Sequence, residues 1–326
     1  MWTKRMPMQP TRREFLRTLF VATQATALGG FLPQGLHAAT DIAHSGGLNF
    51  IVFGDWGRGG QPDQLQVARH MAAETETVGA RFVISVGDNF YTDGVASSHD
   101  PQWQTSFENV YRASSLQIPW YVALGNHDYR GNCDAQIAYG KTSARWKMPA
   151  RYFMQSHSID ATTGVDFFFL DTTPMVRGYY RDDIYRNKVN AQDVGRQLAW
   201  FEDALVASTA RWKIVVGHHP IYSGGEHGDT PELIATVLPL LKQHGVQAYF
   251  NGHDHDLQHL MAGRVHLFDS GAGSEFRDTT KTAHTKFAKA CSGFTTVSLH
   301  SDAMHVRMID SLGRVLYTTS VPQAVV

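Results

Sequence analysis

The stretch Asn49-Phe50-Ile51-Val52-Phe53-Gly54-Asp55-Trp56-Gly57 begins as a mainly apolar run and ends in an aspartate between glycines. A short apolar run of this kind predicts a buried strand. The arrangement recurs at 81–86, which leads into Gly87-Asp88-Asn89-Phe90-Tyr91. In open α/β sheets ligands collect at the ends of strands, and glycine lets the backbone turn sharply there. Asp55 and Asp88 are therefore candidate site residues at one end of a predicted sheet.

Three further apolar runs end in polar blocks of the same kind. They are followed by Gly125-Asn126-His127-Asp128, by Gly217-His218 and by Asn251-Gly252-His253-Asp254-His255. Taken singly, an aspartate or histidine after a strand is commonly a turn or core residue. The Gly-His-x-His block is a stronger signal, because imidazoles two residues apart on an extended segment point to opposite sides and can serve two ions. Together the five blocks predict a dinuclear site for Fe, Mn or Zn.

The rest of the chain alternates short apolar runs with amphipathic ones, which favours α/β architecture in a single domain. The strands expected besides the first two lie at 120–124, 165–170, 213–216, 246–250 and 265–268. The expected helices lie at 64–77, 192–208 and 231–244, the last with a proline in its first turn. Successive antiparallel strands are expected at 294–299, 304–309 and 314–319.

The composition bounds the classes of function. With 326 residues, 43% of them hydrophobic and 18% charged, the chain can bury a substantial core. A formal net charge of −1 and the lack of a basic patch with interleaved aromatics argue against nucleic acid as a partner. The two cysteines, Cys133 and Cys291, are too few for a disulfide framework, and the sequence leaves open whether they pair.

The first 39 residues resemble a twin-arginine export signal. Thr11-Arg12-Arg13-Glu14-Phe15-Leu16-Arg17 precedes an apolar stretch at 19–32, and Ala38-Ala39 offers small residues for cleavage. The alternatives are a basic tail or a membrane anchor, but the apolar stretch is short for a span of ~20 residues, so no stable anchor is expected. We expect a signal peptide at 1–39, a catalytic domain at 40–326, and periplasmic or secreted protein exported by the twin-arginine machinery.

At the five blocks the sequence resembles the metallophosphoesterases, and within them the purple acid phosphatases, particularly the mammalian-type tartrate-resistant enzymes. The family pattern GDxG, GDxxY, GNH(D/E), VxxH and GHxH is met in full and in order. The resemblance covers roughly 48–309 and extends to Arg145-Trp146, Glu226-His227-Gly228 and Ser270-Gly271-Ala272-Gly273. It implies a four-layer α-β-β-α sandwich of two mixed sheets.

The resemblance also implies the roles of the metal ligands. It assigns Fe(III) to Asp55, Asp88, Tyr91 and His255, and a second divalent ion (Fe, Zn or Mn) to Asn126, His218 and His253, with Asp88 bridging the two. Relatives outside the purple acid group usually carry a histidine two residues after the first aspartate, where this chain has Gly57. A phenolate from Tyr91 is a hard donor that favours Fe(III), and charge transfer from it would colour the protein purple.

The implied activity is that of an acid phosphatase, in which a metal-bound hydroxide attacks the phosphorus of a small phosphate monoester. His127 and His227 are the candidate proton donors to the leaving group, with Asp128 as the residue that would orient His127. His227 could instead hold its glycine-rich loop in place. The basic segment 174–190 lacks the cysteine of the mammalian-type enzymes, and a solvated surface role is favoured over substrate contact.

Two other functions remain open at this stage. One is a phosphodiesterase or nucleotide pyrophosphatase, because the same pair of metals serves diesters. The other is a non-catalytic periplasmic protein that binds iron or phosphate. His127 and His227, standing beside a full set of metal ligands, argue against the second reading.

Overall fold

The computed structural model describes residues 47–323. The chain divides into two units, Met1–Ile42 and Ala43–Val326, and every described residue belongs to the second. The predicted export signal and its boundary after residue 39 lie outside the described residues, so they stay predictions. In the described part, no helix is both long and apolar enough to cross a membrane.

The first sheet has seven strands in the order β14-β13-β12-β1-β2-β3-β4. Strands β1, β2, β3 and β4 pair in parallel with one another. Strands β1, β12, β13 and β14 pair antiparallel along the other half of the sheet. The strands are β1 (Leu48–Phe53), β2 (Phe82–Ser85), β3 (Trp120–Val122), β4 (Trp146–Lys147), β12 (Gly293–Leu299), β13 (Ala303–Asp310) and β14 (Val315–Pro322).

The second sheet also has seven strands, in the order β11-β9-β10-β8-β7-β6-β5. Its central strands β10, β8, β7 and β6 are parallel, while β5, β9 and β11 pair antiparallel at the edges. The strands are β5 (Phe153–Ser158), β6 (Gly164–Phe169), β7 (Trp212–Val216), β8 (Ala248–Asn251), β9 (Leu257–Ala262), β10 (Val265–Ser270) and β11 (Thr285–Lys289).

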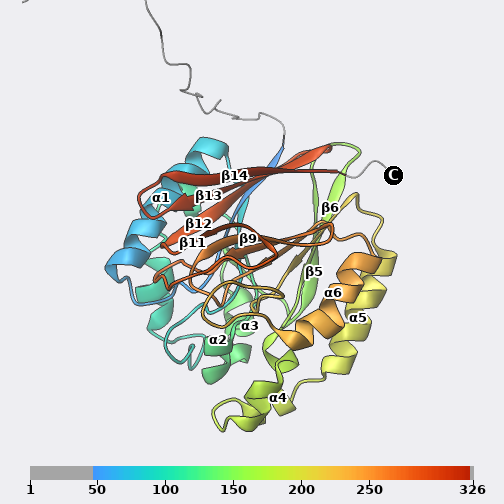
Figure 1. The fold of residues 1–326 in the computed structure, drawn as a ribbon. Coiled ribbons are helices and arrows are strands. Elements are labelled where there is room, and N and C mark those ends of the chain that lie inside the picture. The colour runs from blue at the N-terminus through green and yellow to red at the C-terminus, as the bar shows by residue number, and fades with distance from the viewer. Residues whose placement is uncertain (1–46, 324–326) are drawn as a thin grey trace, which may run out of the picture. The chain divides into compact units, whose positions relative to one another are not determined.

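The helices are α1 (Pro62–Val78), α2 (Asn126–Arg130), α3 (Cys133–Gly140), α4 (Arg186–Asn190), α5 (Val194–Ala207) and α6 (Pro231–Gln243), with short helical turns at Trp103–Glu108, Ser114–Leu116, Thr173–Met175 and Arg177–Arg181. Helix α1 covers the outer face of the first sheet and helices α5 and α6 that of the second, while α4 lies at the bottom of the view (Figure 1). Local chemistry fixes several ends. Proline occupies the first turn of α1 and α6, Asp193 caps α5 by accepting from the Arg196 amide, and Gly79 ends α1 at φ 63°.

Three apolar clusters fill the three spaces between the four layers. The stripe of α1 that includes Val67 and Met71 packs on the outer face of the first sheet. Alternate residues of β1 and β2, such as Phe50 and Phe82, face the second sheet and meet Phe167 there. A third cluster joins α5 and α6 to the outer face of the second sheet. The four-layer sandwich of two mixed sheets expected from the resemblance is therefore confirmed.

The predicted elements agree with the structure in the central strands, which are buried on both faces, and also in partly exposed helices and strands. All seven predicted central strands, the three helices and the three antiparallel strands near the C-terminus are present. The predictions missed α2, α3, α4, β4, β5, β9 and β11. Of these, β5 and β11 are half-exposed edge strands, and β9 contains the buried polar residues Gln258 and His259. None of these three strands therefore has a continuous apolar sequence. Cys133 and Cys291 are both free thiols.

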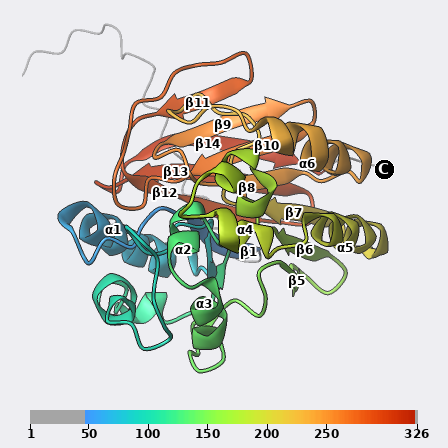
Figure 2. The same ribbon diagram turned by 90° about the horizontal axis from the view of Figure 1, so that it is seen from below.

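The five polar blocks meet at one end of the sandwich, because parallel strands end at the same edge of a sheet. Backbone hydrogen bonds join the blocks there. The Asp55 amide donates to the Gly87 carbonyl over 3.0 Å, and the Gly252 amide donates to the His218 carbonyl over 3.0 Å. Seen from below, α2 and α4 lie near the middle of the view (Figure 2). The Lys188 ammonium of α4 donates to the Gly131 carbonyl that follows α2.

Candidate metal centre

The first group of predicted ligands converges on the Tyr91 hydroxyl. This oxygen lies 2.9 Å from Asp55 Oδ1, 3.0 Å from Asp88 Oδ2 and 3.1 Å from His255 Nε2. His255 Nε2 is also 3.4 Å from Asp55 Oδ1. The four side chains come from three different strand ends, yet their donor atoms share one small volume. They could hold a single ion.

A second group lies beside the first and shares Asp88 with it. His218 Nε2 is 3.0 Å from Asn126 Oδ1 and 3.4 Å from Asp88 Oδ2. Donor atoms of Asp55, Asp88 and His218 all lie within 4.8 Å of one another, and all three residues are buried. Asp88 therefore stands where one carboxylate could contact two neighbouring ions.

His253 completes the second group, although its backbone differs from the expected extended segment. His253 adopts φ 75°, and its amide donates to Asp55 Oδ2 over 3.1 Å. Its ring centroid lies 5.0 Å from that of His218, whereas the ring of His255 is turned toward Tyr91. The two imidazoles lie in different groups of candidate ligands, and a left-handed turn rather than strand alternation separates them.

The electrostatics of the site favour a bound cation. Burial raises the pKa of Asp88, but the neighbouring His218 and His127 outweigh it and hold the pKa below its ordinary value. Burial lowers the pKa of His253 well below its ordinary value, and the other histidines lower it further. These directions favour an ionised Asp88 and a neutral His253, the forms in which both side chains coordinate metals. Burial lowers the pKa of His218, but Asp88 and Asp55 outweigh it and raise that pKa to about 9, so His218 would release a proton on binding an ion.

Of the ligands in the first group, Tyr91 depends most on a nearby positive charge to be deprotonated. Burial, followed by the charges of Asp55 and Asp88, raises the pKa of the Tyr91 phenol well above its ordinary value. A phenolate between two carboxylates is unfavourable unless a highly charged cation lies against all three oxygens. The donor set of the first group thus fits a highly charged cation, and the amide and imidazoles of the second group, with the shared Asp88, fit a second metal ion.

Tight backbone packing holds the ligands in place. Asp55 and Asp88 adopt the left-handed φ values 59° and 49°, which non-glycine residues rarely do and which are characteristic of functional sites. A Cβ atom on Gly57 would lie 1.9 Å from the Asn89 carbonyl oxygen, and one on Gly125 would lie 2.3 Å from the Asp88 amide nitrogen. No side chain of any kind fits at position 57, so the histidine of other metallophosphoesterases is excluded there.

His127 lies at the site but is held differently from the prediction. Its Nδ1 is 2.6 Å from the Thr92 carbonyl oxygen, its Nε2 is 4.0 Å from Asp88 Oδ2, and its ring packs on Tyr91 at a centroid distance of 4.4 Å. Burial lowers its pKa below the ordinary value, although Asp88 and Thr92 act in the opposite direction. The carbonyl of Thr92 therefore sets the tautomer, leaving Nε2 toward the metal ligands.

The proposed orienting role of Asp128 is wrong. Its carboxylate accepts hydrogen bonds from the amides of Gly125 and Asn89 and from the Gln136 side chain, and it makes no hydrogen bond to His127. Burial, followed by the charge of Asp88, raises its pKa to about 7. The buried Asp128 carboxylate thus connects, through hydrogen bonds, the turn that carries Asp88 with the turn that carries Asn126.

His227 has a carboxylate partner that the sequence reasoning missed. Asp254 Oδ1 lies 2.9 Å from His227 Nδ1 and accepts from the His227 amide over 2.8 Å. Ser223 donates to the other oxygen of Asp254. The His227 ring lies 4.0 Å from the His253 ring, and 37% of its side chain is exposed. The arrangement leaves Nε2 free to reach a molecule beside the second group of ligands.

The sequence reasoning also missed the contacts that His219 and the basic segment 174–190 make beside the site. His219 is buried, with Nδ1 2.8 Å from Thr172 Oγ1 and Nε2 2.9 Å from the Tyr179 hydroxyl. The adjacent histidine pair in the sequence was the available signal. Tyr185 of the same segment is buried and accepts a hydrogen bond from Arg130 Nε over 2.6 Å. The segment is anchored beside the site, while Arg177, Arg181 and Arg186 are exposed, as expected of a solvated surface, together with residues such as Asp183 and Ile184.

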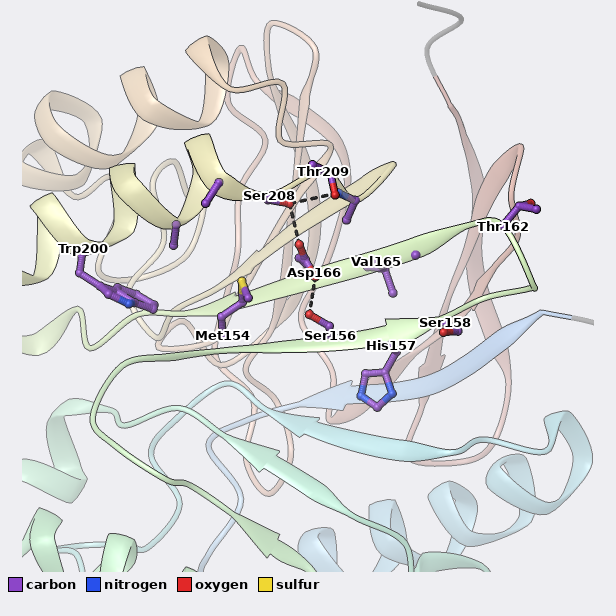
Figure 3. Close-up of a pocket in the computed structure, with 14 residues that line it drawn as sticks. Met154, Ser156, His157, Ser158, Thr162, Val165, Asp166, Trp200, Ser208 and Thr209 are labelled. Carbon is purple, nitrogen blue, oxygen red and sulfur yellow. Dashed lines mark hydrogen bonds between the residues drawn. The ribbon is translucent and has the colours of Figure 1, made fainter.

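A pocket of about 610 Å³ lies elsewhere, between β5, β6 and the end of α5, and contains none of the predicted site residues (Figure 3). Asp166 is its one carboxylate. Both oxygens of Asp166 are occupied, because Ser156 donates to one over 2.5 Å and Ser208 to the other over 2.6 Å. The carboxylate of this pocket is therefore already hydrogen-bonded, and its histidine, His157, stacks on Phe82 at a centroid distance of 4.5 Å. The predicted site residues all lie at or beyond the strand ends instead.

Comparison with known proteins gives consistent matches. The model of the calcineurin-like phosphoesterase family matches residues 48–257. Purple acid phosphatase 17 of Arabidopsis thaliana is 45% identical over 240 residues, which are 71% of this chain and 69% of the relative. Tartrate-resistant acid phosphatase type 5 of Homo sapiens is 36% identical over 300 residues, 85% of this chain and 91% of the relative.

Solved structures match as well. GAP50, the anchor in the inner membrane complex of Plasmodium, has a TM-score of 0.77 at 25% identity, and the match covers 85% of this chain and 89% of that one. The purple acid phosphatase of yellow lupin seeds has a TM-score of 0.61 at 15% identity, with coverage of 86% and 54%. Because one of these proteins is described as an anchor, the fold alone does not establish catalysis, and the donor set has to support that conclusion.

Proposed function

We propose a function from the family of the chain, which belongs to the calcineurin-like phosphoesterases and, within them, to the purple acid phosphatases. We propose that it hydrolyses phosphate monoesters at a site holding Fe(III) and a divalent metal ion. The observation that carries the proposal is the Tyr91 hydroxyl, which lies within 3.1 Å of Asp55, Asp88 and His255. A phenol placed among two carboxylates and an imidazole has no evident structural use, but it completes an iron site.

The residues present fit two ions. Asp55, Asp88, Tyr91 and His255 would hold the ferric ion, and Asn126, His218 and His253 the divalent one, with Asp88 between them. When bound, such a pair of ions would neutralise the phosphate oxygens and activate a water for attack on phosphorus.

The proton for the leaving group is assigned to His227. Asp254 Oδ1 accepts both from the His227 amide and from its ring, which fixes the ring and directs Nε2 outward. Burial would raise the pKa of Asp254, but the hydrogen bonds from His227 and Ser223 hold it below its ordinary value, so this carboxylate stays ionised in mild acid. His127, restrained by the Thr92 carbonyl, lies on the Tyr91 side of the site, where its Nε2 can donate to a bound phosphate oxygen when the ring is protonated.

The iron–tyrosine assignment predicts a visible absorption band. Iron-loaded wild-type protein is expected to absorb broadly at roughly 500–600 nm, and Tyr91→Phe is expected to remove that band, because the phenolate is the source of the charge transfer. Metal analysis and a visible spectrum on the same samples provide the measurement. Tyr179→Phe is the matched control, since Tyr179 lies near the site but bonds His219 instead. Iron-free, colourless and fully active protein would overturn the assignment.

The acid role of His227 predicts a dependence on the leaving group. His227→Ala is expected to lower kcat by about 10²-fold or more for an alkyl phosphate, and much less for a nitrophenyl phosphate, whose leaving group needs no proton. The pH–rate profile for the alkyl ester should also lose one limb. His99→Ala, at an exposed histidine, serves as the control. Equal losses for both esters, or unchanged rates and limbs, would rule out the acid role.

The competing functions are separated by substrate and turnover. Comparing a phenyl phosphate monoester with its diester at pH 5 and pH 7 tests for a phosphodiesterase or nucleotide pyrophosphatase, which would favour the diester. A non-catalytic iron- or phosphate-binding protein would bind phosphate in its fully metallated form without turning over either ester.

The place of action is proposed from residues 11–17 and the apolar stretch that follows them. We infer export by the twin-arginine machinery to the periplasm or beyond, with the metals acquired before transport. Arg12→Lys together with Arg13→Lys should leave full-length protein inside the cell. Undiminished export of that variant would contradict this route.

A further inference from the structure

Arg58 follows the first metal-binding block and lies over the ring of Tyr91. Its guanidinium carbon is 3.8 Å from the centroid of that ring, which is close contact for a cation–π pair. Only 17% of the Arg58 side chain is exposed. The cation is therefore largely shielded from water at the point where it meets a proposed iron ligand.

Two neighbouring residues fix the guanidinium in this position. Arg58 Nε donates to Ser274 Oγ over 3.1 Å, and Ser274 Oγ in turn donates to the Asp55 carbonyl over 2.6 Å. Arg58 Nη2 lies 2.7 Å from Glu275 Oε2. The same arginine thus connects the backbone of one ligand, Asp55, with the ring of another, Tyr91.

A second arginine in the same cluster lacks this relation to the ring. Arg277 lies 3.6 Å from Glu275 Oε1 and 3.1 Å from Glu226 Oε2, and 34% of its side chain is exposed. It carries the same charge and shares a carboxylate with Arg58. The difference between the two arginines is the stacking on Tyr91.

A fixed cation on the face of a phenolate lowers the energy of the ring's π electrons. The phenolate then donates less charge to the metal, so more energy is needed to move an electron from ligand to metal. The metal also becomes a stronger Lewis acid and is easier to reduce. Partly desolvated cation–π contacts are large enough to make these effects measurable.

We propose that Arg58 is a positioning and tuning residue of the iron site, which holds the Tyr91 ring and weakens its donation to Fe(III). This inference rests on the proposed function, because it requires iron bound by Tyr91. It assigns a role to a residue that is not itself a metal ligand. The role is electrostatic, and it acts through the ring face rather than through the hydroxyl.

The test compares two substitutions that remove the same charge. In iron-loaded protein, Arg58→Gln is expected to move the visible band to longer wavelength by roughly 10–20 nm. Its Fe(III)/Fe(II) midpoint potential should become more negative than that of the wild type. Arg277→Gln, the matched control, should leave the band and the potential close to their wild-type values. Both readouts are independent of turnover, and iron content is measured on each sample.

The outcomes separate this inference from the proposed function. Iron-loaded wild-type protein without the band contradicts the ligation by Tyr91. A wild-type band that Arg58→Gln leaves unmoved, or that Arg277→Gln moves equally, contradicts the role of Arg58 alone. If Arg58→Gln retains no iron, Arg58→Lys replaces it. An ammonium does not stack flat as a guanidinium does, so a smaller shift in the same direction is expected, and an unshifted band contradicts the role.

Discussion

Replacing Asp88 with asparagine is expected to lower kcat/KM for a phosphate monoester by at least about 10³-fold, because it removes the charge that both ions share. Oδ2 of Asp88 lies 3.0 Å from the Tyr91 hydroxyl and 3.4 Å from His218 Nε2. Its other oxygen accepts from the His127 amide over 2.7 Å. An amide has one acceptor oxygen where the carboxylate has two, so it cannot serve both groups and His127 together.

Metal content distinguishes this loss from simple misfolding. Asp88→Asn should purify as folded protein with fewer than two metal ions per chain, and added metal should restore little activity. Asp166→Asn is the matched control, since Asp166 is also buried and accepts from Ser156 and Ser208, but far from the strand ends. That variant should keep its metals and its rate. An Asp88→Asn protein with two ions and full activity would exclude the shared-ligand role.

The central strands that the sequence predicted are those buried on both faces. Strands such as β1 and β2 read as continuous apolar runs because they lie between a helix layer and a second sheet. β5 and β11 lie at sheet edges with half-exposed residues, and their sequences resemble loops. In these two strands partial burial leaves the local pattern with little information about pairing, although β14, which is also a half-exposed edge strand, was predicted.

The structure brings the predicted ligands together, but the hydrogen-bond partners of His127 and His227 were not predicted. The donor residues follow apolar strands, and parallel strands necessarily bring their ends together. The partner of His127 was assigned wrongly to Asp128 because the two are adjacent, yet successive residues on a helix such as α2 do not face each other. The partner of His227 is Asp254, which is 27 positions away, and no spacing rule indicates such a contact.

Replacing Gly57 with alanine is expected to lower the free energy of unfolding by about 3 kcal/mol, or the melting temperature by about 5 °C. The added Cβ would lie 1.9 Å from the Asn89 carbonyl oxygen and 3.0 Å from the Phe90 Cα. Both are backbone atoms, so no side-chain rotation relieves the overlap. Gly178→Ala is the control, because nothing lies within 4 Å of its Cβ, and its effect should stay within about 0.5 kcal/mol.

The same substitution is also expected to displace a proposed metal ligand, Tyr91. The Tyr91 amide donates to the Gly57 carbonyl over 2.8 Å, so a shift of the 89–91 turn away from position 57 also moves the phenol away from Asp55. Gly57→Ala should therefore weaken or shift the visible band even in protein that is still folded. A stable Gly57→Ala protein with an unchanged band would show that the turn has room. If the band does change, the glycine at position 57 and the tyrosine ligand at position 91 depend on each other. The turn at 88–91 can place the Tyr91 phenol in the site only when position 57 has no side chain.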